Sequence, residues 1–105
     1  MNFFRPKPIK GLSLLHRVEG VTSTETAEGV FLFDAAGGRL YQLNSSAKAV
    51  WAGIEIPIPL DELCARLVSE FAGDADTIRR DVVSLLEELR QARVIRVSAG
   101  DGNEP

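Results

Sequence analysis

Residues 39–51, RLYQLNSSAKAVW, pass from a strand pattern to a helix pattern without a linker. Leu40 and Leu43 lie among polar and aromatic neighbours and follow a Gly-Gly turn, which is typical of a strand. From Asn44 on, the segment reads as a capped helix that carries the single tryptophan, Trp51. A junction of this kind fixes the edge of a sheet relative to the helices that follow, and it holds a groove open beside that edge.

Two further strands are predicted before this junction. Residues 21–26 are rich in Thr and favour a polar edge strand. Residues 30–33 and 39–43 form the clearest hairpin in the chain, because the AAGG between them tolerates positive φ. The three strands can therefore pair as an antiparallel meander whose last strand is 39–43.

The rest of the sequence is predicted to be helical, with segments at residues 46–52, 60–71 and 77–97. Two prolines in IEIPIP separate the first two segments, and GDADT supplies a turn and a cap before the third. The expected fold class is α+β, winged-helix-like, with a three-stranded antiparallel sheet followed by three helices. We expect an irregular N-terminal arm over residues 1–19, a folded domain over 20–97 and a flexible tail over 98–105.

Composition limits the class of protein. The chain has 105 residues, 45% hydrophobic and 26% charged, which predicts one soluble domain. Its formal net charge of -3 argues against nucleic-acid binding, which usually requires a basic face. One Cys cannot form an internal disulfide, no apolar run approaches the roughly 18 residues of a membrane span, and no secretory signal is evident. These observations predict a cytoplasmic protein without membrane contact.

The residue types that carry catalysis are poorly represented. A single His16 supports no metal site, and Cys64 falls on an apolar helix face where a small core residue is expected. The carboxylate pairs at 61–62 and 87–88 occupy adjacent helix positions, which point about 100° apart and cannot converge on one substrate atom. Gly37 and Gly38 are not followed by the Lys and the helix that a phosphate-binding loop requires. We therefore expect no enzyme activity, no metal and no cofactor.

Two motifs, in their order along the chain, resemble those of PqqD-like proteins, and the resemblance covers residues 20–97. The first is GGRLYQLNSSAKAVW, a glycine turn, a strand ending in aromatic-x-Leu-Asn and a helix ending in Val-Trp. The second is Asp81-Val82 followed by a leucine-rich face and the small hydrophobe Val94, with LDELCARLVSEF between the two motifs. This sequence departs from the family pattern in having IEIPIP where a short Asp-Gly turn is common, and in its long N-terminal arm.

The resemblance implies a peptide-binding domain called a RiPP recognition element. Such domains hold the leader region of a ribosomally synthesised precursor peptide while a partner, such as a radical SAM enzyme, a cyclase or a protease, modifies or cleaves the peptide. Members of the family serve pyrroloquinoline quinone and lasso-peptide biosynthesis. The resemblance also implies that the leader adds as a strand beside the third strand, in a cleft against the third helix.

The residues of this chain allow such a site. At about 100° per residue, Ile78, Val82, Leu85 and Leu89 share a face toward the core, and a second stripe lies a quarter-turn away. This stripe combines apolar contact with positive charge and suits an amphipathic peptide with Leu, Ile and acidic residues. The predicted peptide-binding residues are Arg39, Leu40, Tyr41, Gln42 and Leu43 on the strand, with Arg79, Val83, Leu86 and Arg90 on the helix.

Two other functions are compatible with the same elements. A winged-helix DNA-binding regulator would read DNA with the last helix, where arginines are offset by neighbouring Asp and Glu. A self-associating structural subunit would pair the same strand edge with a second copy, giving a homodimer. Dimerisation and peptide binding would then compete for one surface.

Overall fold

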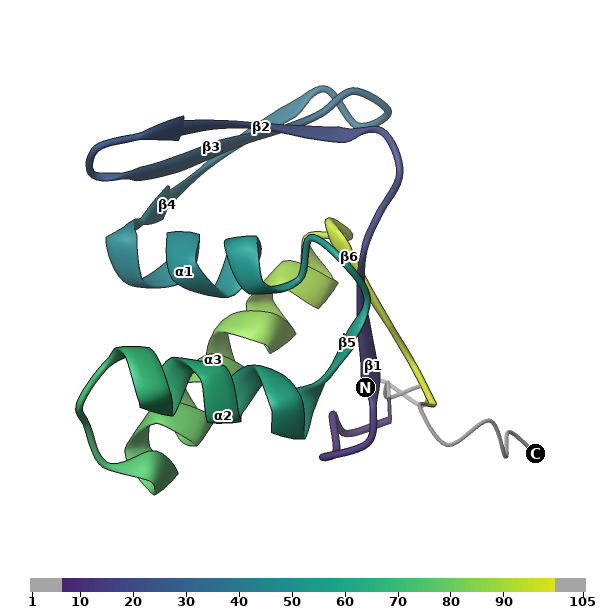
Figure 1. Ribbon diagram of the computed structural model, residues 1–105. Helices are drawn as coiled ribbons and strands as arrows, with labels where there is room; N and C mark the ends of the chain where they lie inside the picture. Colours follow the sequence, from purple (N-terminus) through teal and green to yellow (C-terminus); the bar gives the residue numbers. More distant parts are fainter. Residues whose placement is uncertain (1–6, 100–105) are drawn as a thin grey trace, which may run out of the picture.

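The computed structural model describes residues 7–99 and contains the predicted meander and three helices, together with a second sheet (Figure 1). The fold class is α+β, as predicted, with two three-stranded antiparallel sheets in place of one. The elements in chain order are β1 (Leu14–Arg17), β2 (Val21–Thr26), β3 (Gly29–Asp34), β4 (Arg39–Asn44), α1 (Ser45–Gly53), β5 (Ile58–Pro59), α2 (Leu60–Glu70), α3 (Ala75–Gln91) and β6 (Ile95–Ser98).

The predicted meander is confirmed as the sheet β2-β3-β4. The β3–β4 register runs from Gly29 opposite Asn44 to Asp34 opposite Arg39. Gly29 is required by close packing, because a Cβ at this position would lie 1.8 Å from the carbonyl oxygen of Leu43. The hairpin turn places Gly38 at a φ of 65°, a conformation that favours glycine. The two ends of the hairpin thus depend on glycine for different reasons.

The junction between β4 and α1 has the predicted form. Asn44 is in extended conformation, and its Oδ1 accepts a hydrogen bond of 2.9 Å from the backbone N–H of Ala47. Trp51 is 2% exposed and belongs to the core. The guanidinium of Arg17 on β1 stacks 4.2 Å from the centre of the Trp51 ring, a cation–π contact that fastens α1 to the second sheet.

The second sheet, β5-β1-β6, corrects three sequence expectations. Leu14–Arg17 form a strand within the arm that was expected to be irregular, and Ile58–Pro59 pair with it where only a break was expected. The last helix ends at Gln91 rather than continuing to residue 97, and Arg93 adopts a φ of 63° before the chain enters β6. These strands pair segments more than 40 residues apart, so short-range periodicity gives little sign of them.

The layers explain where the core lies. The sheet β2-β3-β4 covers one side of α1, and α2 and α3 lie on the other side (Figure 1). Core side chains come from every layer, with Leu15, Leu32, Ile54, Leu60, Leu63, Leu86 and Val94 at 1% exposure or less. The outer face of the sheet carries Phe33 and Leu40, which are paired across β3 and β4 and exposed.

The N-terminal arm, residues 7–13, packs against α2 and α3. Pro59 precedes α2 without a side-chain cap, and the arm supplies the missing acceptors. The carbonyls of Gly11 and Ser13 accept from the N–H groups of Asp61 and Leu60, at 2.9 and 3.0 Å. Ile9 is 9% exposed and joins the core. The arm is therefore irregular, as expected, but it completes the N-terminus of a helix.

The expected flexible tail begins at residue 98, and residues 100–105 of it lie outside the described residues, as do residues 1–6 of the expected arm. Ser98 itself is the last residue of β6, opposite Leu14.

Candidate functional site

The strand β4 forms an edge of its sheet. Within the described range it pairs with β3 on one side, and no strand pairs with its other side. An edge strand presents backbone N–H and C=O groups that can pair with another chain. Side chains alternate along it: Leu40 and Gln42 are exposed, whereas Tyr41 and Leu43 are half-buried against the core cluster. β4 therefore meets the backbone requirement for strand addition.

A cleft of about 350 Å³ opens beside the end of β4. Three helices build its walls, and most of the side chains that line it are apolar. Asp81 is the charged residue in this lining. The lining residues are Asn44, Ser46, Ala47 and Val50 from the junction and α1, Leu67 and Phe71 from α2 and the residue after it, and Ile78, Asp81, Val82 and Leu85 from α3.

One hydrogen bond and the lining of the cleft indicate that β4 and α3 lie near one another and run in opposite directions. Tyr41 donates a hydrogen bond of 3.5 Å from its hydroxyl to the carbonyl of Ala92, just after α3. Asn44 shares the cleft with Leu85, seven residues earlier on the helix. Seven helical residues span about 10 Å, and the three steps from Tyr41 to Asn44 also span about 10 Å. The cleft thus begins at Asn44, the last residue of β4, and extends along one side of α3.

The side of α3 that meets this cleft, which we name the cleft flank, comprises Ile78, Asp81 and Leu85. At about 100° per residue, Asp81 and Val83 lie roughly 160° apart around the helix axis. Val83 shares the far side with Arg79 and Arg90, and we name these three residues the opposite flank. The two flanks have different surroundings, so they cannot contribute to one peptide channel beside β4.

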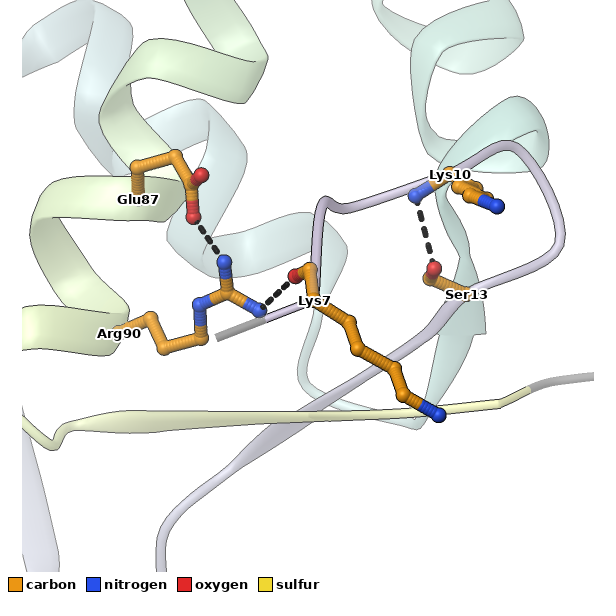
Figure 2. A network of polar contacts seen from close by, with 5 residues as sticks. All are labelled: Lys7, Lys10, Ser13, Glu87 and Arg90. Atoms are coloured by element: carbon orange, nitrogen blue, oxygen red, sulfur yellow. Dashed lines mark hydrogen bonds and ion pairs between the residues drawn. The ribbon is translucent and has the colours of Figure 1, made fainter. Parts of the chain in front are cut away.

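The opposite flank is occupied by other parts of the chain. Arg79 forms an ion pair of 2.8 Å with Asp61 at the start of α2, and a hydrogen bond with Asp61 raises the pKa of Arg79. Arg90 pairs with Glu87 and donates a hydrogen bond of 2.9 Å to the carbonyl of Lys7 in the N-terminal arm (Figure 2). Val83 is half-buried against the core. The predicted helix stripe therefore faces α2 and the arm, not the edge of β4.

The expectation that Leu86 contacts a peptide is corrected. Its side chain is 0% exposed and lies in the core, because the apolar stripe of α3 is centred on Val82, Leu86 and Leu89. The half-buried residues of this face, Ile78 and Leu85, lie toward the cleft. The centre of the core stripe therefore lies roughly 40° around the helix axis from the predicted centre, toward Leu86.

The predicted strand residues are placed as follows. Arg39, Leu40 and Gln42 are exposed on β4, and Tyr41 and Leu43 point inward between the sheet and the helices. A hydrogen bond with Tyr41 raises the pKa of Arg39. None of the predicted peptide-binding residues lines the cleft, and its lining residues, Ser46, Phe71 and Asp81 among them, were not predicted as site residues. Asp81 could have been identified from the sequence as a site residue, because it is an acidic residue beside the apolar stripe of the helix and stands four residues before Leu85.

Reactive groups do not gather at the cleft. Within residues 7–99, no group of three His, Cys, Asp or Glu side chains could hold a metal ion. Cys64 is 6% exposed, and burial raises the pKa of its thiol. His16 lies on β1 and hydrogen-bonds Ser98 at 2.9 Å, and burial lowers its pKa. In the same range, no helix has the length and apolar composition to cross a membrane. The cleft offers a backbone edge, apolar walls and one carboxylate.

Solved structures with the same fold include two complexes with peptides. One is TbiB1 in complex with the TbiA(beta) leader peptide, with a TM-score of 0.72, 20% identity, and coverage of 77% of this chain and 94% of that one. Another is lasso peptide synthetase B1 complexed with its leader peptide, with a TM-score of 0.69, 20% identity, and coverage of 78% and 96%. A third, solved by solution NMR, is the PqqD truncation of Methylobacterium extorquens PqqCD.

That truncation is described as a functional, stand-alone recognition element for ribosomally synthesised and post-translationally modified peptides. It matches with a TM-score of 0.67 and 20% identity, over 79% of this chain and 88% of the other. Curated proteins give no sequence match. The family model for coenzyme PQQ synthesis protein D (PqqD) matches residues 29–95, which span β3 through the start of β6. The chain belongs to the PqqD family.

Proposed function

We propose that this protein binds the leader region of a ribosomally synthesised precursor peptide and presents it to a modifying enzyme. The observation that carries the proposal is the free edge of β4 beside an open, mainly apolar cleft on α3. Membership of the PqqD family and the likeness in fold to two leader-peptide complexes support the same function.

The mode of binding follows from the strand edge. An extended peptide would pair with residues 39–43 through main-chain hydrogen bonds, which supply affinity with little regard to sequence. Alternate side chains of that peptide would point between β4 and the cleft flank of α3. One apolar side chain of Leu size buried there would contribute about 1.5–3 kcal/mol. The cleft would thereby select the peptide, and the strand edge would hold it.

The domain would act without catalysing a reaction. Its partner would be the enzyme that modifies the peptide, such as a radical SAM enzyme, a cyclase or a protease, in the cytoplasm where the precursor is made. Binding along β4 leaves the outer face of the sheet open, with Phe33 and Leu40 exposed. The bound peptide would continue beyond the domain at both ends of β4, so its core segment could reach the enzyme.

Neither rival function accounts for the site as well. DNA binding by α3 would need a strongly basic face, yet Arg79 and Arg90 are engaged with carboxylates, Asp and Glu lie beside the remaining arginines, and the formal net charge is -3. Self-association through β4 would use the same edge but would leave the apolar cleft without a role. Homodimerisation would thus compete with the peptide for β4.

Calorimetric titration tests the proposal, using the leader half of the precursor peptide encoded beside the gene and the core half as a control. We expect binding of the leader half alone. Leu85→Gln, in the cleft, should weaken binding at least tenfold, because it places an amide where an apolar side chain would pack. Val83→Gln, on the opposite flank and equally half-buried, is the matched variant and should bind as the wild type does.

Thermal unfolding of both variants verifies that each remains folded at the titration temperature. Equal weakening by the two folded variants would place the peptide away from the cleft. Absence of binding by the wild type to any part of the precursor would remove the proposed function.

A further inference from the structure

We infer that the peptide recognised at this cleft is basic: it carries a bulky apolar side chain flanked by two Lys or Arg residues, two to four positions apart. The inference rests on the proposed function and specifies the class of peptide that the site accepts. It reverses the acidic peptide expected from the sequence, because the side of α3 that faces β4 is not the one that carries the arginines.

The first observation is an acidic pair on the cleft side of α3. Asp81 lines the cleft, and Glu88 follows it by seven residues, which returns to the same side of the helix within about 20°. Leu85 lies between the two carboxylates. This arrangement places an apolar contact between two negative charges on one side of α3, with Glu88 level with β4 and Asp81 one turn beyond the end of the strand.

The second observation is that these carboxylates have no cation to neutralise them. Both side chains are exposed, and neither forms an ion pair with another residue in the range 7–99. In contrast, the arginines of the opposite flank are paired, Arg79 with Asp61 and Arg90 with Glu87. The two sides of α3 thus differ in charge: paired arginines lie on the opposite flank, and unpaired carboxylates lie on the side that would meet a peptide.

Two cations near the sheet do not compete with a peptide for Asp81: Lys48 is engaged with other residues, and Arg39 lies at the other end of β4. Lys48 on α1 donates to the carbonyl of Thr26 at 2.8 Å and lies 3.6 Å from Glu25. Arg39 stands at the far end of β4, opposite Asp34 in the strand register. Arg80, the residue before Asp81, is exposed and lies about 100° from Asp81 around the helix axis, so a peptide cation on the cleft side would lie nearer to the Asp81 carboxylate than to this arginine.

The distance between Asp81 and Glu88 sets the spacing of the two cationic residues in the peptide. Asp81 and Glu88 are separated by about 10 Å along the helix axis, and extended chain covers that distance in about three residues. Lys and Arg side chains are long enough to accommodate a spacing of two to four residues. The apolar residue between them would enter the cleft beside Leu85, so hydrophobic and charged recognition would come from one short segment.

Selection from a displayed library of random peptides of about twelve residues, long enough to span β4 on both sides, tests the inference even while the precursor is unidentified. We expect the enriched peptides to share a bulky apolar residue flanked by Lys or Arg. Enrichment of acidic or uncharged peptides would overturn the charge inference while leaving peptide binding in place. Failure to enrich any peptide would overturn the proposed function and, with it, this inference.

Charge variants of the protein locate the recognition. Asp81→Asn with Glu88→Gln removes two negative charges at the cleft, and Glu19→Gln with Glu55→Gln removes two from exposed positions in the turns after β1 and after α1. For an enriched basic peptide, we expect the first pair of substitutions to weaken binding roughly fivefold to thirtyfold, as two partly exposed ion pairs would. The control pair should change binding less than twofold. Equal effects of the two pairs would show that overall charge, rather than this flank, governs the preference.

Discussion

Asn44 is the residue at which the strand becomes the helix. Its backbone pairs with Gly29 as the last position of β4, while its side chain caps α1 through Ala47. The same residue lines the cleft, so the end of the binding edge and the start of the helix share one anchor. This feature could be predicted from the sequence, because a capping residue directly after a strand is a local signal.

Replacing Asn44 with Ala should lower the free energy of unfolding by about 1 kcal/mol, since the N–H of Ala47 would lose its acceptor. Asn44→Asp retains a capping oxygen and should remain within about 0.5 kcal/mol of the wild type. Urea denaturation followed by circular dichroism measures both. Equal stability of the Ala variant and the wild type would show that the cap contributes little here.

Asp74 provides the corresponding cap for α3 and makes stability depend on pH. Its carboxylate accepts from the backbone N–H and hydroxyl of Thr77, both at 2.9 Å, and these bonds hold the pKa of Asp74 below its ordinary value of 3.8. A depressed pKa in the folded state means that the ionised form stabilises the fold. That contribution is complete above the ordinary value and is lost as the pH falls through the folded-state pKa.

Asp74→Asn keeps a capping oxygen that does not titrate. The wild type should therefore exceed the variant in stability near neutral pH, and the difference should shrink as the pH falls below about 4. Thermal melts at a series of pH values between neutral and strongly acidic give this difference directly. A difference that stays constant over the series would rule out a titrating role for Asp74.

At the scale of elements, the parts predicted correctly are those with local signals. The glycine-rich hairpin, the capped junction and the amphipathic faces of α2 and α3 are each visible within a short stretch of sequence. The strands β1, β5 and β6 were missed because each is short and gains its order from partners far along the chain. Helix α3 was extended too far because the apolar residues from Val94 onward continue its pattern, although Val94 lies in the turn after the helix and Ile95 and Val97 belong to β6.

The candidate site shows why element prediction does not suffice for site prediction. The strand half of the predicted site lies on β4, which is an edge in the structure, and its role in peptide binding stays a prediction. The helix half depended on which direction the core stripe of α3 faces, and that direction is set by packing against α2 and β6. The structure places Asp81 in the cleft, whereas Arg79 and Arg90 lie on the opposite flank, where they contact Asp61 and the N-terminal arm.

The N-terminal arm is the element least expected to matter for stability. Ile9→Ala should lower the free energy of unfolding by about 1–3 kcal/mol, because Ile9 packs in the core with 9% exposure and its truncation leaves a cavity at the core edge. Lys10→Ala is the control, since Lys10 is exposed and its described hydrogen bond uses the backbone N–H. Chemical denaturation of the two variants compares them. Equal stability would mean that the arm does not dock in solution.

At the scale of the whole molecule, the two sheets have different roles, one in holding the fold together and one in peptide binding. The sheet β5-β1-β6 joins the arm and the end of the chain to the helices, and it holds α3 through β6. The meander contributes the free edge of β4, and α1 fixes that edge over the cleft. Peptide binding would add a fourth strand to the meander and should protect β4 without altering the second sheet.

The most direct test of strand addition beside the cleft is an NMR titration of the isotopically labelled protein with the leader half of the neighbouring precursor. The predicted result is large amide shift changes and slowed hydrogen exchange along β4, with side-chain shift changes at Ile78 and Leu85. Val83, on the opposite flank, and His16, on the second sheet, should change little. Changes concentrated at Val83 and the N-terminal arm, with β4 unaffected, would contradict the account.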